Sequence, residues 1–355
     1  MSTIIFDEES TEAVTVYDLH DVTLNGSFVQ NAETKKLHDY ISYMGKICLC
    51  FCHGNVEPGT TTGFDKIESV VLPDEIKTIG NYTFYGLSKL ESINIPDKVK
   101  TIGILAFGEC CKLKEVTIPN GVNKIGEGAF WNCKGLRSIA VPESVTEIGD
   151  TAFAYCSGLE EAVVANGVKS LGREAFYNCE NLKSIVIPDT LEAIENNTFE
   201  GCTSLKEALI SDNVTRIGVK AFADCESLEN ISLPLNMVEI GMEAFKNCKK
   251  LKSIMFPDGI KEISNGIFDG CESLTSVSIP NSVKEIKCMA FRDCTNIKRL
   301  VIPDSVKKIS DEAFVGCNLE DLTIECSKGS YAAEYAKRIG IKCLDKNRRF
   351  TLEID

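Results

Sequence analysis

The 355-residue sequence lacks the features that mark membrane-spanning or exported proteins. No stretch approaches the roughly 18 consecutive apolar residues that a membrane-spanning helix requires. Asp7, Glu8 and Glu9 stand near the start, where a secretory signal would have basic residues and then an apolar run. The sequence as given therefore predicts no membrane span and a cytoplasmic protein, or a cell-surface or secreted protein if a leader has been removed.

Positive charge is also scarce. The chain has 52 acidic residues against 38 lysines and arginines, a formal net charge of -14. A protein with this balance is repelled by phosphate backbones and by anionic surfaces through long-range electrostatics. We therefore expect no nucleic-acid partner.

Histidine is rarer still, with three residues in the whole chain. His20, His38 and His53 all lie within residues 1–66, ahead of the repeats that make up most of the sequence. No phosphate-binding loop, nucleophile elbow or zinc-protease motif occurs in the chain. The sequence therefore predicts a protein that is not an enzyme and that needs no cofactor.

A 23-residue repeat dominates the rest of the chain. Phenylalanine recurs eleven times at this interval, from Phe84 to Phe314. Cysteine follows three residues later in ten of the eleven copies, and leucine follows six residues later in most of them. One such unit cannot bury its apolar side chains alone, so the repeat predicts a solenoid in which successive coils stack.

Each repeat divides into two parts. Apolar residues alternate at positions such as Ile93 and Ile95, which predicts a short strand, and proline ends that segment in nine of eleven copies. On the return side the apolar spacing widens, as at Val122 and Ile125, which suits an irregular or partly helical segment. The residue before many of the cysteines favours a second turn, as at Asn132, Asn178, Asp224 and Gly270.

The consensus Leu-x-x-Ile-x-Ile-Pro-x-x-Val-x-x-Ile-Gly-x-x-Ala-Phe-x-x-Cys closely resembles the BspA-like, or Treponema pallidum-type, leucine-rich repeats. The resemblance covers residues 67 to about 326. It implies an α/β repeat fold, a leucine-rich-repeat solenoid of about eleven coils with a parallel β-sheet on one face. Members of the family are commonly bacterial or parasite surface proteins that bind other proteins. The resemblance therefore implies a binding role, but it transfers no specific site residues.

Both ends of the chain depart from the repeat, as the ends of a solenoid must if its core is to be covered. We assign residues 1–66 to an N-terminal cap, 67–326 to the leucine-rich-repeat solenoid and 327–355 to a C-terminal helix-strand cap. The N-terminal cap is expected to contain a helix over residues 32–43 and a strand over 46–51. In the C-terminal cap, Tyr331, Tyr335 and Ile339 have helical spacing, Gly340 suits a helix end, and residues 341–344 return as a strand.

The repeated cysteines, Cys110 to Cys317, have three interpretations: disulfides, thiolate metal ligands or small buried hydrophobic residues. Stacked in register at the strand spacing of about 4.8 Å, their Cβ atoms would lie further apart than a disulfide prefers. A buried thiol in apolar surroundings keeps its proton and is inert. We therefore expect reduced, buried thiols, and a reducing compartment fits them best.

Two metal hypotheses compete with simpler interpretations. Cys48, Cys50, Cys52 and His53 could supply soft ligands to zinc, but alternate residues of a strand fan out along the backbone and do not curl around an ion. We expect a buried strand face there instead. A row of acidic residues just after the prolines could hold a cation, although turn chemistry explains it as well. The sequence therefore predicts no metal site.

A candidate binding site lies on the strand residues that point away from the core. At these positions the middle of the repeat array is apolar and the neighbouring outward row carries acidic residues, whereas a solvated sheet face is usually polar. The alternative is that β-branched residues favour strands whatever they contact. The patch consists of Ala140, Val163, Val186, Leu209 and Met255, with Glu115, Glu161 and Glu207 beside it.

Two functional classes remain open. One is a module that captures a protein partner, and the other is a structural or self-associating surface protein. The oligomeric state distinguishes them, because a partner-binding module would be a discrete monomer or dimer and a self-associating protein would polymerise with concentration. If the strand-face patch is not the site, the next candidates are the aromatic residues Tyr85, Trp131 and Tyr177.

Overall fold

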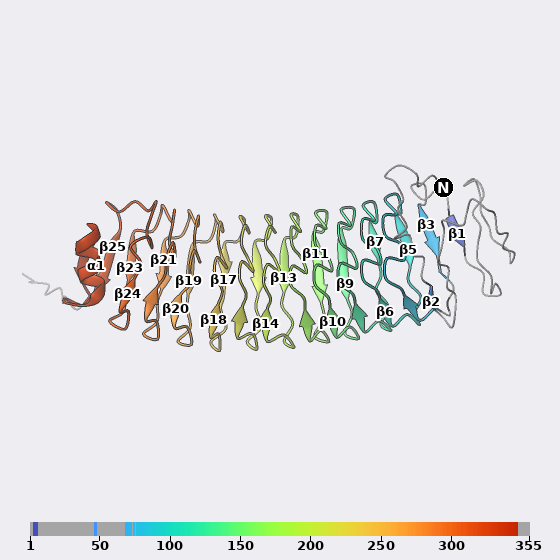
Figure 1. Cartoon of the computed structure of the whole chain (residues 1–355), viewed down its shortest axis with the longest axis horizontal. Helices are drawn as coiled ribbons and strands as arrows, with labels where there is room; N and C mark the ends of the chain where they lie inside the picture. Colours follow the sequence, from blue (N-terminus) through green and yellow to red (C-terminus); the bar gives the residue numbers. More distant parts are fainter. Residues whose placement is uncertain (1–2, 6–45, 48–67, 73, 75, 347–355) are drawn as a thin grey trace, which may run out of the picture. The chain divides into compact units, whose positions relative to one another are not determined.

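A computed structural model describes residues 3–5, 46–47, 68–72, 74 and 76–346. The chain divides into two compact units, Met1–Leu191 and Glu192–Asp355. Within each unit, successive coils carry short parallel strands in register at intervals of 23 residues, as between Ser69 and Ser92 or between Ser253 and Ser276 (Figure 1). Each unit is therefore a parallel β-solenoid, as the repeat predicts.

The first strand of each coil has the predicted alternation of buried and exposed side chains. In β9, Ile139 and Val141 are buried, whereas Ser138 and Ala140 are exposed. In the first unit these strands are β1 (Thr3–Ile5), β3 (Ser69–Val71), β5 (Ser92–Asn94), β7 (Glu115–Val116), β9 (Ser138–Val141), β11 (Glu161–Val164) and β13 (Ser184–Val186). In the second unit they are β15 (Glu207–Leu209), β17 (Asn230–Ile231), β19 (Ser253–Met255), β21 (Ser276–Ser278), β23 (Arg299–Val301) and β25 (Thr323–Cys326).

The return side of each coil is irregular, as one of the two alternatives expected, and it contains a two-residue strand where the other alternative expected helix. Each return strand has two residues, typically an outward polar residue and a buried apolar one, such as Lys124 and Ile125 in β8. In the first unit they are β2 (Lys46–Ile47), β4 (Thr78–Ile79), β6 (Thr101–Ile102), β8 (Lys124–Ile125), β10 (Glu147–Ile148) and β12 (Ser170–Leu171). In the second unit they are β14 (Ala193–Ile194), β16 (Arg216–Ile217), β18 (Glu239–Ile240), β20 (Glu262–Ile263), β22 (Glu285–Ile286) and β24 (Lys308–Ile309).

The glycine that follows a return strand explains why this part of the coil forms a strand and not a helix. A Cβ atom added to Gly126, directly after β8, would lie 2.7 Å from the carbonyl carbon of Gly103 in the preceding coil. Real Cβ atoms do not approach backbone so closely, so this position requires glycine. The coils therefore meet backbone to backbone, at a separation that the much wider helix cannot adopt.

The turn around each phenylalanine carries a third set of contacts between coils. Backbone N–H groups of alternate residues donate to carbonyls of the next coil: Leu105 to Glu127, Phe107 to Ala129 and Glu109 to Trp131, at 2.7–2.8 Å. Leu105 and Glu109 have φ values of 50° and 63°. The turn predicted before the cysteines is confirmed, because Asn132, Asn178, Asp224 and Gly270 have φ values of 60°, 54°, 58° and 74°.

The core is built from stacked columns of identical side chains. Within the first unit the rings of Phe84, Phe107, Phe130, Phe153 and Phe176 stack with centroids 5.1–5.4 Å apart. In the second unit the corresponding separations are 5.2–6.0 Å, and the rings from Phe199 to Phe291 are fully buried. Burying a phenylalanine contributes roughly 1.5–3 kcal/mol, so these columns are principal sources of stability.

The C-terminal segment has the predicted helix and strand. Helix α1 (Tyr331–Ile339) begins after Ser330 and ends at Gly340, whose φ is 81°. Strand β26 (Lys342–Asp345) pairs in parallel with β25. The hydroxyl of Tyr335 donates to the carbonyl of Ser310 at 3.0 Å, which fixes α1 on the last coil. That this segment acts as a cap remains a prediction.

At the N-terminal end, the described residues add one more strand to each sheet. β1 pairs in parallel with β3, and β2 pairs in parallel with β4. β2 coincides with the start of the strand predicted over 46–51. The remainder of that strand, the predicted helix over 32–43, and Cys48, Cys50, Cys52 and His53 lie outside the described residues. No helix in the described part of the chain has the length and apolar content needed to cross a membrane.

Candidate functional site

The strand-face patch points outward, as the sequence predicts. In the first unit, Val163 and Val186 are 63% and 57% exposed, and Ala140 is also exposed. Val163 lies directly opposite Ala140 in the register of β9 and β11, and β13 contacts β11 on the other side. The first unit therefore brings Ala140, Val163 and Val186 together as one continuous apolar row.

In the second unit the apolar residues of this row are interrupted by serine. Leu209 is 53% exposed, and the exposed Ser232, directly after β17, occupies the equivalent position one repeat later. Met255 is 72% exposed and lies opposite Ser278. Within the first unit the apolar residues of the proposed patch are therefore continuous, whereas within the second unit serines alternate with them.

The acidic residues predicted beside the patch are exposed on the same strands. Glu115 begins β7, Glu161 begins β11 and Glu207 begins β15. In the adjoining position, charges of both signs form ion pairs, such as Lys183 with Glu160 at 2.5 Å. Because of that pair, the pKa of the Glu160 carboxyl is lowered and that of Lys183 is raised. Such exposed pairs add little stability but keep the border of the patch charged.

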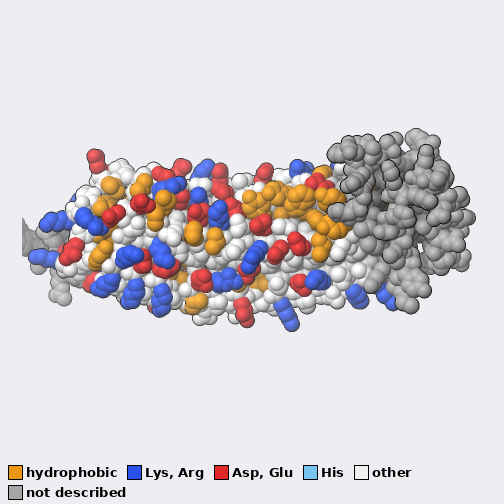
Figure 2. Space-filling view, in the orientation of Figure 1, with side chains coloured by type: hydrophobic (Ala, Val, Ile, Leu, Met, Phe, Trp, Pro, Cys, Tyr) orange, Lys and Arg blue, Asp and Glu red, His pale blue; other side chains and the backbone are white. Residues whose placement is uncertain are grey.

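Aromatic side chains gather on the outer turns of the first unit. The rings of Trp131 and Tyr155 meet edge to face at 6.0 Å, and those of Tyr155 and Tyr177 at 5.3 Å. Tyr85 and Leu105 cover Gly108, where an added Cβ atom would lie 2.9 Å from each side chain. Figure 2 shows apolar side chains gathered over coils of this unit. The sequence identified Tyr85, Trp131 and Tyr177, but it missed Tyr155, whose only signal was an aromatic residue directly before Cys156.

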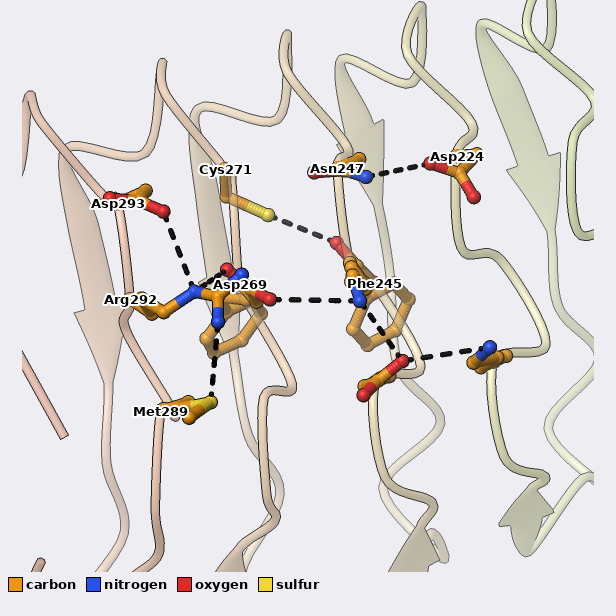
Figure 3. A network of polar contacts seen from close by, with 12 residues as sticks. Asp224, Phe245, Asn247, Asp269, Cys271, Met289, Arg292 and Asp293 are labelled. Carbon is orange, nitrogen blue, oxygen red and sulfur yellow. Dashed lines mark hydrogen bonds and ion pairs between the residues drawn. The ribbon is translucent and has the colours of Figure 1, made fainter. Parts of the chain in front are cut away.

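The second unit carries charged residues on the same turns (Figure 3). The Asp269 carboxylate is almost fully buried and accepts a hydrogen bond from Arg292 Nε at 2.8 Å, with Lys246 Nζ at 3.8 Å. Asn247 donates to the Asp224 carboxylate at 2.7 Å. The network is a chain of ion pairs and amide contacts that connects coils. Among residues 68–72, 74 and 76–346, the structure places no group of three or more potential metal ligands together.

The repeated cysteines are buried, except that Cys317 is half-buried, and their thiols form hydrogen bonds. The Cys133 thiol donates to the Phe107 carbonyl of the preceding coil at 3.1 Å. In the same way, the Cys248 thiol donates to the Phe222 carbonyl at 3.2 Å. Burial raises the pKa of both thiols, and it raises the pKa of Cys317 to about 11. Protonated and inaccessible thiols are poor nucleophiles and poor metal ligands, so the column contributes to packing.

The repeats match a known family. The sequence profile of the BspA type leucine rich repeat region matches residues 62–183, 146–274 and 215–336. The chain therefore belongs to the family of BspA-type leucine-rich-repeat proteins. No curated protein is significantly similar to the chain.

Solved structures agree with this assignment. A leucine-rich repeat protein from Bacteroides ovatus is 30% identical, with a TM-score of 0.57, over 80% of this chain and 85% of that one. A leucine rich cell surface protein from Faecalibacterium prausnitzii is 29% identical, with a TM-score of 0.51, over 80% of this chain and 83% of that one. Proteins of this class are repeat scaffolds of the kind that mediate interactions.

Proposed function

We propose that this chain is a non-catalytic binding module that recognises a protein partner through the outward residues of its longer strands. The observation that carries the proposal is the continuous exposed row of Ala140, Val163 and Val186 in the first unit. Contiguous apolar patches rimmed by polar residues are a feature of protein interaction sites. The acidic residues Glu115 and Glu161 on the same face favour a partner with basic residues around an apolar centre.

The likeness to the Faecalibacterium cell surface protein supports a surface location for this chain as part of the same proposal. The alternative, a structural protein that associates with itself, would use the same face. Sedimentation over a range of protein concentrations distinguishes the two, because self-association through this face would increase the sedimentation coefficient with concentration.

The binding site is tested with Val163→Glu combined with Val186→Glu. We expect this double variant to lose a partner that the wild-type chain captures from cell extract, with its melting temperature within a few degrees of wild type, because both side chains are exposed. Asn94→Glu combined with Thr117→Glu is the matched control, since these residues occupy the same repeat position in the same unit. Undiminished capture by the folded Val163/Val186 variant would exclude this face and leave the Tyr85, Trp131 and Tyr177 surface as the candidate.

A further inference from the structure

Two thiols meet at the C-terminal end of the second unit. The sulfur of Cys326, the last residue of β25, lies 3.2 Å from the sulfur of Cys343, the second residue of β26. The two strands pair in parallel with Ile324 opposite Cys343, so the cysteines form a diagonal pair across the gap between neighbouring strands. Helix α1 connects these strands, so a disulfide between the two sulfurs would close a covalent loop that contains α1.

The two cysteines differ in their access to solvent. Cys343 is exposed, whereas Cys326 is buried. Burial, together with the neighbouring Cys343 thiol, raises the pKa of Cys326 to about 11. The repeated cysteines differ from both in their partner, because a thiol such as that of Cys248 donates to a backbone carbonyl. Since thiol exchange requires a thiolate that can reach the oxidant, Cys343 is the accessible member of the pair.

We propose that Cys326 and Cys343 form a thiol–disulfide exchange site whose substrate is a small disulfide of the glutathione disulfide class, and that oxidation links β25 to β26. The inference does not depend on the binding function. It assigns a modification site to the segment that packs on the last coil.

The reaction proceeds in two balanced steps. The Cys343 thiolate attacks one sulfur of glutathione disulfide, forming a mixed disulfide and releasing one glutathione thiolate. Cys326 then loses its proton to solvent and attacks the Cys343 sulfur, forming the protein disulfide and releasing the second glutathione thiolate. Two protein thiols are oxidised and one glutathione disulfide is reduced to two glutathione molecules. The buried position of Cys326 makes it the resolving thiol.

The geometry requires a small movement of the edge strand. The sulfurs must close from 3.2 Å to the disulfide length of about 2.05 Å. β26 is the end strand of its sheet within the described chain, and its four side chains are exposed. We therefore expect β26 to move toward β25 when the bond forms.

The test incubates the reduced, folded, full-length protein with glutathione disulfide and maps its peptides by mass spectrometry. Peptide mapping is chosen because it reads the 326–343 link directly, independently of the other thiols of the chain. We expect a peptide joining Cys326 to Cys343 with the loss of two hydrogen atoms. We also expect slower amide exchange in α1 after oxidation, because the bond fixes the strands on both sides of the helix.

Variants separate this site from general thiol oxidation. Cys326→Ser should accumulate a stable glutathione adduct on Cys343, because the resolving thiol is missing. Cys111→Ser is the matched control and should leave the 326–343 link unchanged, since Cys111 is half-buried and its sulfur contacts the Glu109 carboxylate at 3.7 Å. Absence of the linked peptide would overturn the proposal. A Cys326→Ser variant without an adduct would overturn the assignment of Cys343 as the attacking thiol.

Discussion

The outer turns of the two units use the same backbone for different surfaces. At the positions two before and one after each core phenylalanine, the first unit carries apolar side chains such as Tyr85, Leu105 and Trp131. The second unit carries Lys246 and Arg292 at the equivalent positions, where they pair with acidic residues. The repeat therefore fixes the residue types in the columns that face the core. The residue types in the outward columns differ between the two units.

Buried thiols with a raised pKa occur in both units. In the first unit burial raises the pKa of Cys110 and Cys133. In the second unit it raises the pKa of Cys225, Cys248, Cys271, Cys294 and Cys317. Alkaline pH should therefore weaken both units.

The sign of this pH effect follows from proton binding. Each folded-state pKa is raised above the ordinary value of 9.0, so the stabilisation is fully present below pH 9 and is lost as pH rises toward the folded pKa. Each such thiol costs about 1.4 kcal/mol of unfolding free energy per pH unit in that window. We expect both units to lose unfolding free energy over this pH window.

The single tryptophan provides the measurement, because Trp131 lies in the first unit. In an alkaline titration, the tryptophan emission maximum and the far-ultraviolet circular dichroism should change over the same pH range. Cys248→Ala should shift the circular dichroism change to higher pH. A circular dichroism change without any shift of the tryptophan emission would contradict the expectation for the first unit.

The phenylalanine column should be equally important in both units. Phe130→Ala and Phe245→Ala each remove a fully buried ring that stacks on both sides. We expect each to cost about 3–5 kcal/mol through lost burial and a cavity, measured by denaturant unfolding. A much smaller loss for one of them would mean that the core of that unit rearranges to fill the space.

The ionic network should contribute a smaller amount, and only to the second unit. Arg292→Met leaves the buried Asp269 carboxylate without its hydrogen bond at 2.8 Å, whereas Lys246 at 3.8 Å remains. Because Arg292 is partly exposed, we expect a loss of about 1–3 kcal/mol in unfolding free energy. Asp293→Asn is the control, since asparagine tolerates the left-handed φ of 57° at this turn and the exposed Asp293 carboxylate, 3.5 Å from Arg292, should matter little. Equal effects of the two variants would show that burial of Asp269 is not what makes the network important.

The sequence predicted what recurs at a fixed interval. The strands, the buried phenylalanines and cysteines, the turn before each cysteine and the helix after Ser330 all follow from periodicity, burial or capping chemistry. The return strands were missed because two residues are too few to show an alternation. The left-handed positions two before each phenylalanine were missed because residues as different as Tyr82, Leu105 and Glu174 occupy them.

The candidate surfaces were predicted less completely than the core. The outward direction of Val163 and Leu209 followed from strand alternation, because one buried position fixes its neighbours. The contact between Trp131 and Tyr155 did not, since it joins residues at different positions of adjacent repeats. The ion pair of Arg292 with Asp269 joins the same position of adjacent repeats, 23 residues apart, so the predicted stacking of coils could have identified it.

The hydrogen bonds of the outer turns have an electrostatic consequence. Every second N–H around the phenylalanines donates toward the next coil, from Leu105 to Tyr155 in the first unit and from Asn197 to Asp293 in the second. The peptide dipoles of each column therefore add instead of cancelling, as they do along a helix axis. Each column has its positive end at its last coil. Asp311 and Glu312 stand in the last turn of the second unit, where negative charge is favoured.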